Sequence, residues 1–181
     1  NFPDSLNIGT LKMNMDINYS KLNKSKNIIF LPSSNEIEFK HLLKTLLEIY
    51  KKYPDFTYIW RNHPFIDNKI KNIFSNYKNI KISNNNLTYD LKRSKLAFYT
   101  ISSSIIPAVC FGVRPIYVKN KYLSIDPLKD LDNIWKVTYE RLPDLNLIYN
   151  YQKNKNLINH MRKSSNYYKK YFEPFNATVL K

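Results

Sequence analysis

Between residues 27 and 119 the chain alternates between short, continuous apolar runs and longer segments in which apolar residues recur every three or four positions. Short apolar runs that end in turn residues are typical of strands buried on both faces of a sheet. We therefore expect strands at 27–34, 56–64, 79–83, 96–100 and 114–119.

The intervening segments have the spacing of helices. The clearest begins after residue 35, carries Leu42 and Leu46 on one face, and is closed by Pro54. Ser34 or Asn35 can cap its start. Weaker helices are expected at 66–76, within 84–95, after the serines at 102–104, within 126–137 and near 147–172.

Alternating strands and helices favour a parallel sheet covered on both faces and joined by right-handed crossovers. We expect a Rossmann-like, three-layer α/β/α fold with a mainly parallel sheet of five or six strands. The expected organisation is a linker or entry arm at 1–26, a Rossmann-like lobe at 27–146 and a helical extension at 147–181. This extension either packs on the lobe or crosses to a partner lobe.

The charge balance is strongly basic, with a net charge of +15 over 181 residues. The 24 lysines and five arginines are scattered along the chain, whereas readers of nucleic acid favour arginine forks. Lys, Asn, Ile and Tyr, all with A/T-rich codons, dominate together, so genome composition is one explanation of the excess. Attraction to an anionic membrane surface, a polyanionic glycan or a nucleotide is the other.

Composition also bounds the cellular setting. The single cysteine, Cys110, excludes an internal disulfide framework and a cysteine-based zinc site. No apolar run approaches the roughly 20 residues that span a bilayer, and residues 1–10 do not look like a signal peptide. We expect a cytoplasmic protein, peripheral at the inner face of the membrane if the basic surface has a lipid partner. The chain does not begin with Met, so we expect it to be a fragment of a longer protein.

In parallel sheets ligands bind at the carboxyl ends of the strands, which points to the turns at 32–35, 61–65 and 101–105. The chain has only Gly9 and Gly112 and contains neither GxGxxG nor GxxxxGK[ST]. A phosphate site would therefore rely on serine hydroxyls and backbone N–H groups.

The third turn contains Ser102, Ser103 and Ser104. Pro107 is tolerated only in the first turn of a helix, so a helix capped by Ser104 places it at the third helical position. Hydroxyls, free N–H groups and the positive helix end then form an anion site. The alternative is a plain capped helix, for which one serine would be enough.

The other two turns are weaker candidates. Ser33 and Ser34 form a secondary one, because acidic residues follow them at the positions that a phosphate would occupy, and capping alone explains them. The middle turn places Arg61, His63 and Pro64 at a strand end. Pro64 favours an extended backbone at His63, whose imidazole can donate to a phosphate oxygen or act as a general acid.

Two other kinds of site are not expected. The three histidines lie on different elements and the acidic residues do not cluster, so no metal site is predicted. A serine hydrolase would need nucleophile-elbow glycines, which the sequence lacks.

The combination "RNHP … LKRSKLAFYTISSSIIPAVCFGVRPIYV" resembles the carboxyl-terminal, nucleotide-binding lobe of GT-B glycosyltransferases across residues 27–119. It is most similar to bacterial capsule and surface-polysaccharide transferases, including CMP-sialic acid, CMP-Kdo and CDP-glycerol glycerophosphotransferase-like enzymes. The resemblance implies that His63 and the three serines bind the donor phosphate, and that a sugar or polyol phosphate passes from a CMP- or CDP-activated donor to a glycan acceptor. It implies no cofactor beyond that donor, and a separate amino-terminal lobe that supplies the catalytic base.

One departure from the family pattern bears on the donor. Many retaining GT-B enzymes have a glutamate shortly after the serines that holds the ribose, and Pro107 occupies that position here. This favours a cytidine nucleotide over UDP or GDP. A UDP-sugar 2-epimerase-like lobe and a non-enzymatic basic module that binds anionic glycan or nucleic acid remain as alternatives.

Overall fold

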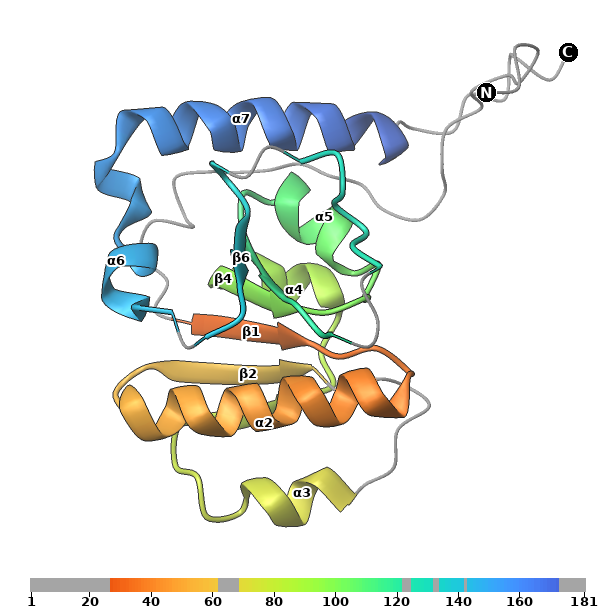
Figure 1. The fold of residues 1–181 in the computed structure, drawn as a ribbon, viewed down its shortest axis with the longest axis vertical. Helices are drawn as coiled ribbons and strands as arrows, with labels where there is room; N and C mark the ends of the chain where they lie inside the picture. The colour runs from red at the N-terminus through yellow and green to blue at the C-terminus, as the bar shows by residue number, and fades with distance from the viewer. Residues whose placement is uncertain (1–26, 62–68, 122–124, 132–133, 142, 173–181) are drawn as a thin grey trace, which may run out of the picture.

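The computed structural model describes residues 27–61, 69–121, 125–131, 134–141 and 143–172. Within these residues six strands form one sheet with helices on both faces (Figure 1). Every pair of neighbouring strands is parallel. The predicted Rossmann-like α/β/α class is confirmed.

Strand order places the two central strands side by side. The strands are β1 (Asn27–Leu31), β2 (Thr57–Arg61), β3 (Ile80–Ser83), β4 (Ser94–Tyr99), β5 (Arg114–Val118) and β6 (Val137–Tyr139). Their order is β3-β2-β1-β4-β5-β6, so the direction of chain progression reverses between β1 and β4. Leu31 lies opposite Tyr99 in the register of these two strands, so both strands end at the same edge.

The helices divide between the two faces of the sheet. They are α2 (Glu36–Lys52), α3 (Lys69–Phe74), α4 (Leu87–Leu91), α5 (Ile105–Cys110), α6 (Leu145–Tyr149) and α7 (Lys155–Lys169), with short 3₁₀ turns η1 (Tyr151–Lys153) and η2 (Lys170–Phe172). In Figure 1 α2 and α3 lie on one side of β1 and β2, and α5 and α7 lie on the other.

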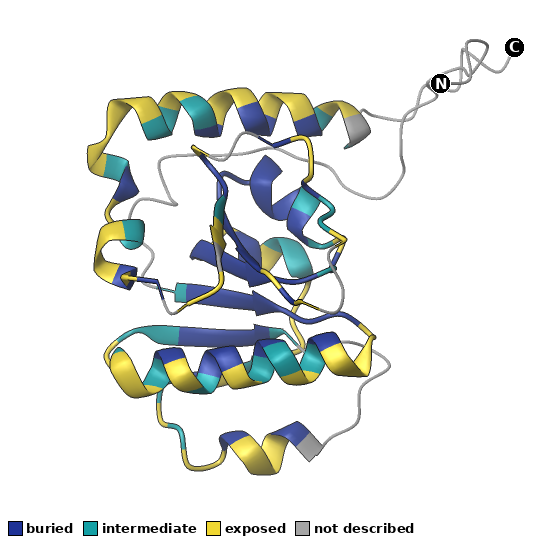
Figure 2. Ribbon diagram, viewed as in Figure 1, coloured by how far each residue is buried: buried dark blue, intermediate teal, exposed yellow. Residues whose placement is uncertain are grey.

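The core follows from this layering, and all six residues of β4 are buried (Figure 2). On the α2 side Phe30 stacks on Phe98 with ring centroids 4.7 Å apart. Leu42, Leu46 and Ile49 of α2 close this layer, each fully buried. Burial of one such side chain stabilises the fold by roughly 1.5–3 kcal/mol. This confirms the predicted apolar face of the helix.

The helix predicted across 126–137 is wrong. The described residues of this segment, 126–131 and 134–136, contain turns and bends and no helix, and β6 begins at Val137. The Asp126 carboxylate accepts the Leu128 N–H at 2.9 Å and binds Lys136 at 2.6 Å. These side-chain contacts favour a turn over a helix, as Asp commonly does. The apolar spacing in this segment reflects separate side chains that reach the core from successive turns.

Helix α7 packs against α5 on the outside of the lobe (Figure 1). The Ser165 hydroxyl donates to the Cys110 carbonyl oxygen at 2.8 Å, which joins the two helices. Among the described residues, no helix has both the length and the apolar character needed to cross a membrane.

Candidate functional site

The candidate site lies where β1 and β4 end. Ser33 follows β1, Thr100 follows β4, and the strand order reverses between these two strands. Sheets of this kind bind ligands at such a switch point, beyond the carboxyl ends of the strands. The fold therefore selects two of the three turns expected from the sequence, those at 32–35 and 101–105.

Two hydroxyls at this edge are buried without a partner. Ser33 is 7% exposed and Thr100 is 1% exposed, and neither side-chain oxygen has a hydrogen-bond partner within the described part of the chain. Leaving a buried hydroxyl unpaired costs about 1–3 kcal/mol. These two hydroxyls follow the ends of neighbouring strands, so a ligand bound at this edge can form hydrogen bonds with both.

The first turn does not need its serines for capping. The Asn35 side chain caps α2 and accepts the Ile37 and Glu38 N–H groups at 3.0 and 3.1 Å. The predicted cap at this helix start is therefore confirmed for Asn35. Ser34 is exposed, while Ser33 lies beneath it. Both hydroxyls remain outside the capping interaction.

The serine turn has the helix start that Pro107 predicts. Ser104 is the residue before α5, and Pro107 is the third residue of the helix. The Ser104 side chain, however, makes no capping hydrogen bond. Backbone bonds close the turn instead, from the Ile105 N–H to the Ser102 carbonyl oxygen at 3.2 Å and from the Ile106 N–H to the Ser103 carbonyl oxygen at 3.1 Å.

The serine hydroxyls consequently neither cap α5 nor close the turn before it. Ser102 is buried, Ser104 is half-buried and Ser103 is exposed. No hydrogen bond of these three hydroxyls is found within the residues that the structure covers. Because α5 has only six residues, its dipole is short and the hydroxyls are the stronger feature of this turn.

The structure gives Arg61 an ion pair on the β3 side of the sheet. Its Nη1 donates to the buried Asp90 carboxylate at 2.8 Å and to the Asn85 carbonyl oxygen at 2.6 Å. Ser83 donates to the other oxygen of the same carboxylate at 2.9 Å. Arg61 thus ties β2 to the segment between β3 and α4. His63 and Pro64, the other residues predicted for this turn, lie outside the described residues.

The first turn of α2 contains a buried carboxylate. Its structural role could not be read from the sequence. Glu38 is 1% exposed and accepts a hydrogen bond from the Asn120 Nδ2 at 3.0 Å. Asn120 follows β5, so this contact ties the start of α2 to the end of the third strand at this edge. An acidic residue at a helix start normally indicates only a favourable dipole interaction, which is why the sequence did not reveal the tie.

A second polar cluster anchors the segment after β5. The Tyr99 hydroxyl donates to Asp126 at 2.9 Å, and Lys136 donates to the other Asp126 oxygen at 2.6 Å and to the Leu128 carbonyl oxygen at 2.8 Å. Burial, followed by the Asp126 charge, raises the pKa of Tyr99 above its usual range. Tyr99 therefore stays neutral and holds this segment against the end of β4.

No group of three or more His, Cys, Asp or Glu side chains that could hold a metal ion is found in the part of the chain described. The polar groups that the described residues present at the β1/β4 edge include the hydroxyls of Ser33, Thr100 and the three serines at 102–104.

Several solved structures have a fold similar to the one described above. No protein-family model matches the sequence, and no curated protein matches it as a relative. The fold is similar to a Listeria monocytogenes protein assigned as a UDP-N-acetylglucosamine 2-epimerase (TM-score 0.52, 16% identity, 90% of this chain and 45% of that chain). It is also similar to TarM (0.53, 15%, 86% and 33%) and to the pneumococcal O-GlcNAc transferase GtfA in complex with UDP and GlcNAc (0.51, 15%, 82% and 33%).

These similarities show the fold alone, a Rossmann-like α/β/α arrangement. The chain spans less than half the length of each of these three structures.

Proposed function

We propose that this chain is the donor-binding lobe of a GT-B glycosyltransferase. The observation that carries the proposal is the pair of buried, unpaired hydroxyls of Ser33 and Thr100 at the β1/β4 switch point. The free serine hydroxyls at 102–104 extend the same edge toward solvent. Similarity to glycosyltransferase folds supports a nucleotide-activated sugar or polyol as the ligand.

The proposed chemistry uses hydroxyl donors on the leaving group. When the bond between the transferred carbon and the donor phosphate oxygen breaks, negative charge collects on the phosphate. Preorganised donors at Ser102, Ser103 and Thr100 would stabilise that charge, with His63 as the proposed general acid or additional donor. The acceptor hydroxyl forms the new bond and gives its proton to a base on the second lobe, outside these 181 residues. Capsule or another surface polysaccharide is the proposed product.

The proposal also specifies the base of the donor nucleotide. Pro107 in place of a ribose-binding glutamate favours a CMP- or CDP-activated donor. One similar structure, in contrast, is a complex with UDP. CDP and UDP carry the same diphosphate and ribose, so only a comparison of bases separates the two donors.

The test is a titration of the 181-residue chain with CMP, CDP, UDP and GDP, followed by the shift in melting temperature. Saturable binding that weakens about ten-fold or more in Ser33→Ala and Ser103→Ala supports the site, because hydrogen bonds to charged groups contribute about 1.5–3 kcal/mol. Ser75→Ala is the matched control, since Ser75 is an exposed serine after α3. If none of the four nucleotides binds, or all three variants bind equally well, the donor-site assignment is wrong.

A 2-epimerase-like activity is the second candidate, favoured by the similarity in fold that covers 90% of this chain. Such an enzyme needs carboxylates around the sugar. Glu38, the buried carboxylate found at this edge, is bound to Asn120. Conversion of UDP-N-acetylglucosamine to its 2-epimer without any acceptor would favour this candidate over glycosyl transfer.

A further inference from the structure

The outer face of α7 carries cations and no acid. Lys155, Asn159, Arg162, Lys163, Asn166, Tyr167 and Lys170 are all exposed and recur every three or four residues. This spacing places them on one side of α7 and its extension η2, opposite the buried Met161, Ser165 and Tyr168. We call this set of seven residues the α7 outer face.

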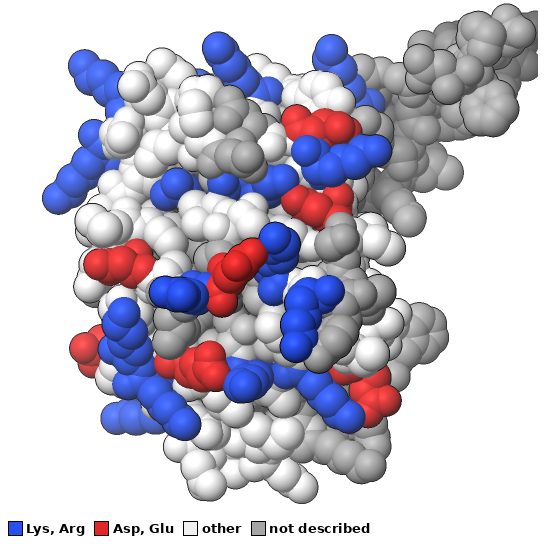
Figure 3. All heavy atoms as spheres, in the orientation of Figure 1, with Lys and Arg blue, Asp and Glu red and all other residues white. Residues whose placement is uncertain are grey.

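The four cations of this face have no ion pair among the described residues. Some surface lysines elsewhere are paired within the described residues: Lys40 binds Glu36 at 2.6 Å, and Lys119 binds Glu140 at 2.9 Å. No acidic residue occurs between Asp144 and Glu173. The cations of this face therefore have no ion-pair partner in the described part of the chain. Figure 3 shows Lys and Arg projecting along the α7 edge of the molecule, with Asp and Glu interspersed among the cations over the rest of the visible face.

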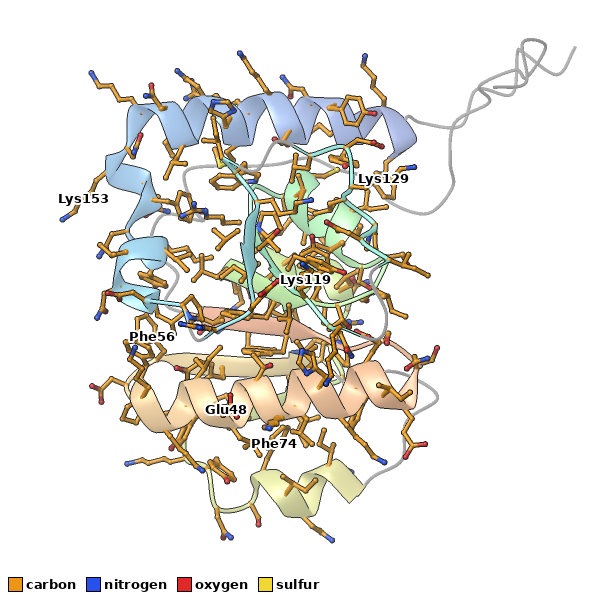
Figure 4. The ribbon with its side chains drawn as sticks, in the orientation of Figure 1. Glu48, Phe56, Phe74, Lys119, Lys129 and Lys153 are labelled. Carbon is orange, nitrogen blue, oxygen red and sulfur yellow. The ribbon has the colours of Figure 1, made fainter. Side chains whose placement is uncertain are left out.

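We propose that the α7 outer face docks on an anionic lipid surface. Helix α7 is the outermost layer on its side of the molecule and has 15 residues, or about 22 Å at 1.5 Å per residue (Figure 1). A straight, convex row of cations contacts a plane along its whole length. Lys153, on η1 just before α7, points away from the molecule (Figure 4).

The residue types agree with a bilayer. Lysine is a compact point charge that contacts headgroup phosphates without requiring a fork geometry. Tyr167, 45% exposed within the stripe, has the amphipathic ring that is enriched at membrane interfaces. A single-stranded nucleic-acid site would combine a basic groove with stacking rings, whereas this face is a convex helix with one exposed ring.

This docking would set the orientation of the lobe. In Figure 1 α7 runs roughly along the direction of β1, so the strands would lie along the membrane plane and their carboxyl edge would open sideways. The proposal does not depend on the identity of the ligand at that edge.

The test is sedimentation of the 181-residue chain with phosphatidylcholine vesicles that contain about one-third phosphatidylglycerol, at about 0.15 M salt. Two triple variants remove the same charge from opposite sides of the molecule, and glutamine keeps good helix propensity in both. They are R162Q/K163Q/K170Q on the α7 outer face and, as control, K71Q/K78Q/K81Q at exposed positions on and after α3.

The wild-type chain is expected to bind these vesicles and not pure phosphatidylcholine. Each cation near the surface contributes about five-fold in partitioning, so the α7 variant should lose on the order of 100-fold. The control should lose less than about two-fold, because its charges lie beyond a Debye length from the bilayer. Equal losses in both variants, equal binding to neutral vesicles, or displacement from vesicles by single-stranded RNA would overturn the proposal.

Discussion

Thr100→Val is the sharpest test of the candidate site, because it should raise stability and lower affinity at once. Valine keeps the β-branched shape of threonine and removes only the hydroxyl. That hydroxyl is 1% exposed and unpaired within the described residues. Its removal should increase the free energy of unfolding of the ligand-free chain by about 1–3 kcal/mol. For a chain of this size each kcal/mol raises the melting temperature by about 2–4 °C.

The same change should weaken binding of the donor. If the Thr100 hydroxyl donates to a charged phosphate oxygen in the complex, its loss costs about 1.5–3 kcal/mol of binding free energy, or roughly 10- to 150-fold in Kd. Thermal denaturation of the free chain and a nucleotide titration measure the two quantities separately. Thr45→Val is the matched control, since Thr45 is 7% exposed but lies within α2, away from the strand ends.

Three results would refute this reasoning. A Thr100→Val chain that is less stable than wild type would mean that the hydroxyl is satisfied within the folded protein. A more stable chain with unchanged nucleotide affinity would mean that the unpaired hydroxyl is unrelated to ligand binding. Equal effects of Thr45→Val on affinity would make both changes nonspecific.

Three further outcomes are expected. Lys136→Met should lower the free energy of unfolding in urea by about 3 kcal/mol because it removes the buried cation that pairs with the partly buried Asp126 carboxylate, whereas Lys119→Gln at an exposed pair should change it by less than about 1 kcal/mol; similar losses would contradict the burial argument. Burial raises the pKa of the Cys110 thiol to about 12, so a thiol reagent at neutral pH should modify it only after unfolding; rapid labelling of the folded chain would contradict this. Burial lowers the pKa of Lys95, so this residue contributes a rise of the free energy of unfolding with pH just below the ordinary lysine pKa, against the fall contributed by buried tyrosines whose pKa is raised; Lys95→Met should therefore shift the measured slope of stability against pH toward a steeper fall, and an unchanged slope would refute the assignment.

The class of the fold could be predicted because the strands are buried on both faces and read as continuous apolar runs. Strand β6 could not be predicted in this way. It has three residues, and the preceding segment places Leu128, Leu131 and Trp135 at spacings that resemble a helix. The contact between Asp126 and Lys136 stabilises the turns of this segment in place of a helix. These residues are ten positions apart, and the spacing of apolar residues gives no information about such a contact.

From the sequence, only the position of the candidate site at the carboxyl ends of strands could be predicted. Pro107 fixed the start of α5, and the serines were therefore placed correctly at the end of β4. Arg61 looked like a free cation beside a phosphate site, yet its partner Asp90 lies 29 residues away in sequence. Thr100 looked like an ordinary strand residue. Its importance arises from a missing partner, which only the packing of β1 against β4 reveals.

The distribution of unpaired polar groups favours a binding edge over general imperfection of the core. Buried charges elsewhere are satisfied: the Arg114 guanidinium donates to three carbonyl oxygens near the amino edge of the sheet. The unpaired buried nitrogens within the described residues belong to His41, Trp60 and Trp135, which lie on three separate elements: α2, β2 and the segment before β6. The unpaired hydroxyls behave differently, because both follow the ends of neighbouring central strands. A packing defect would place them anywhere in the core, whereas a ligand site requires them at this edge.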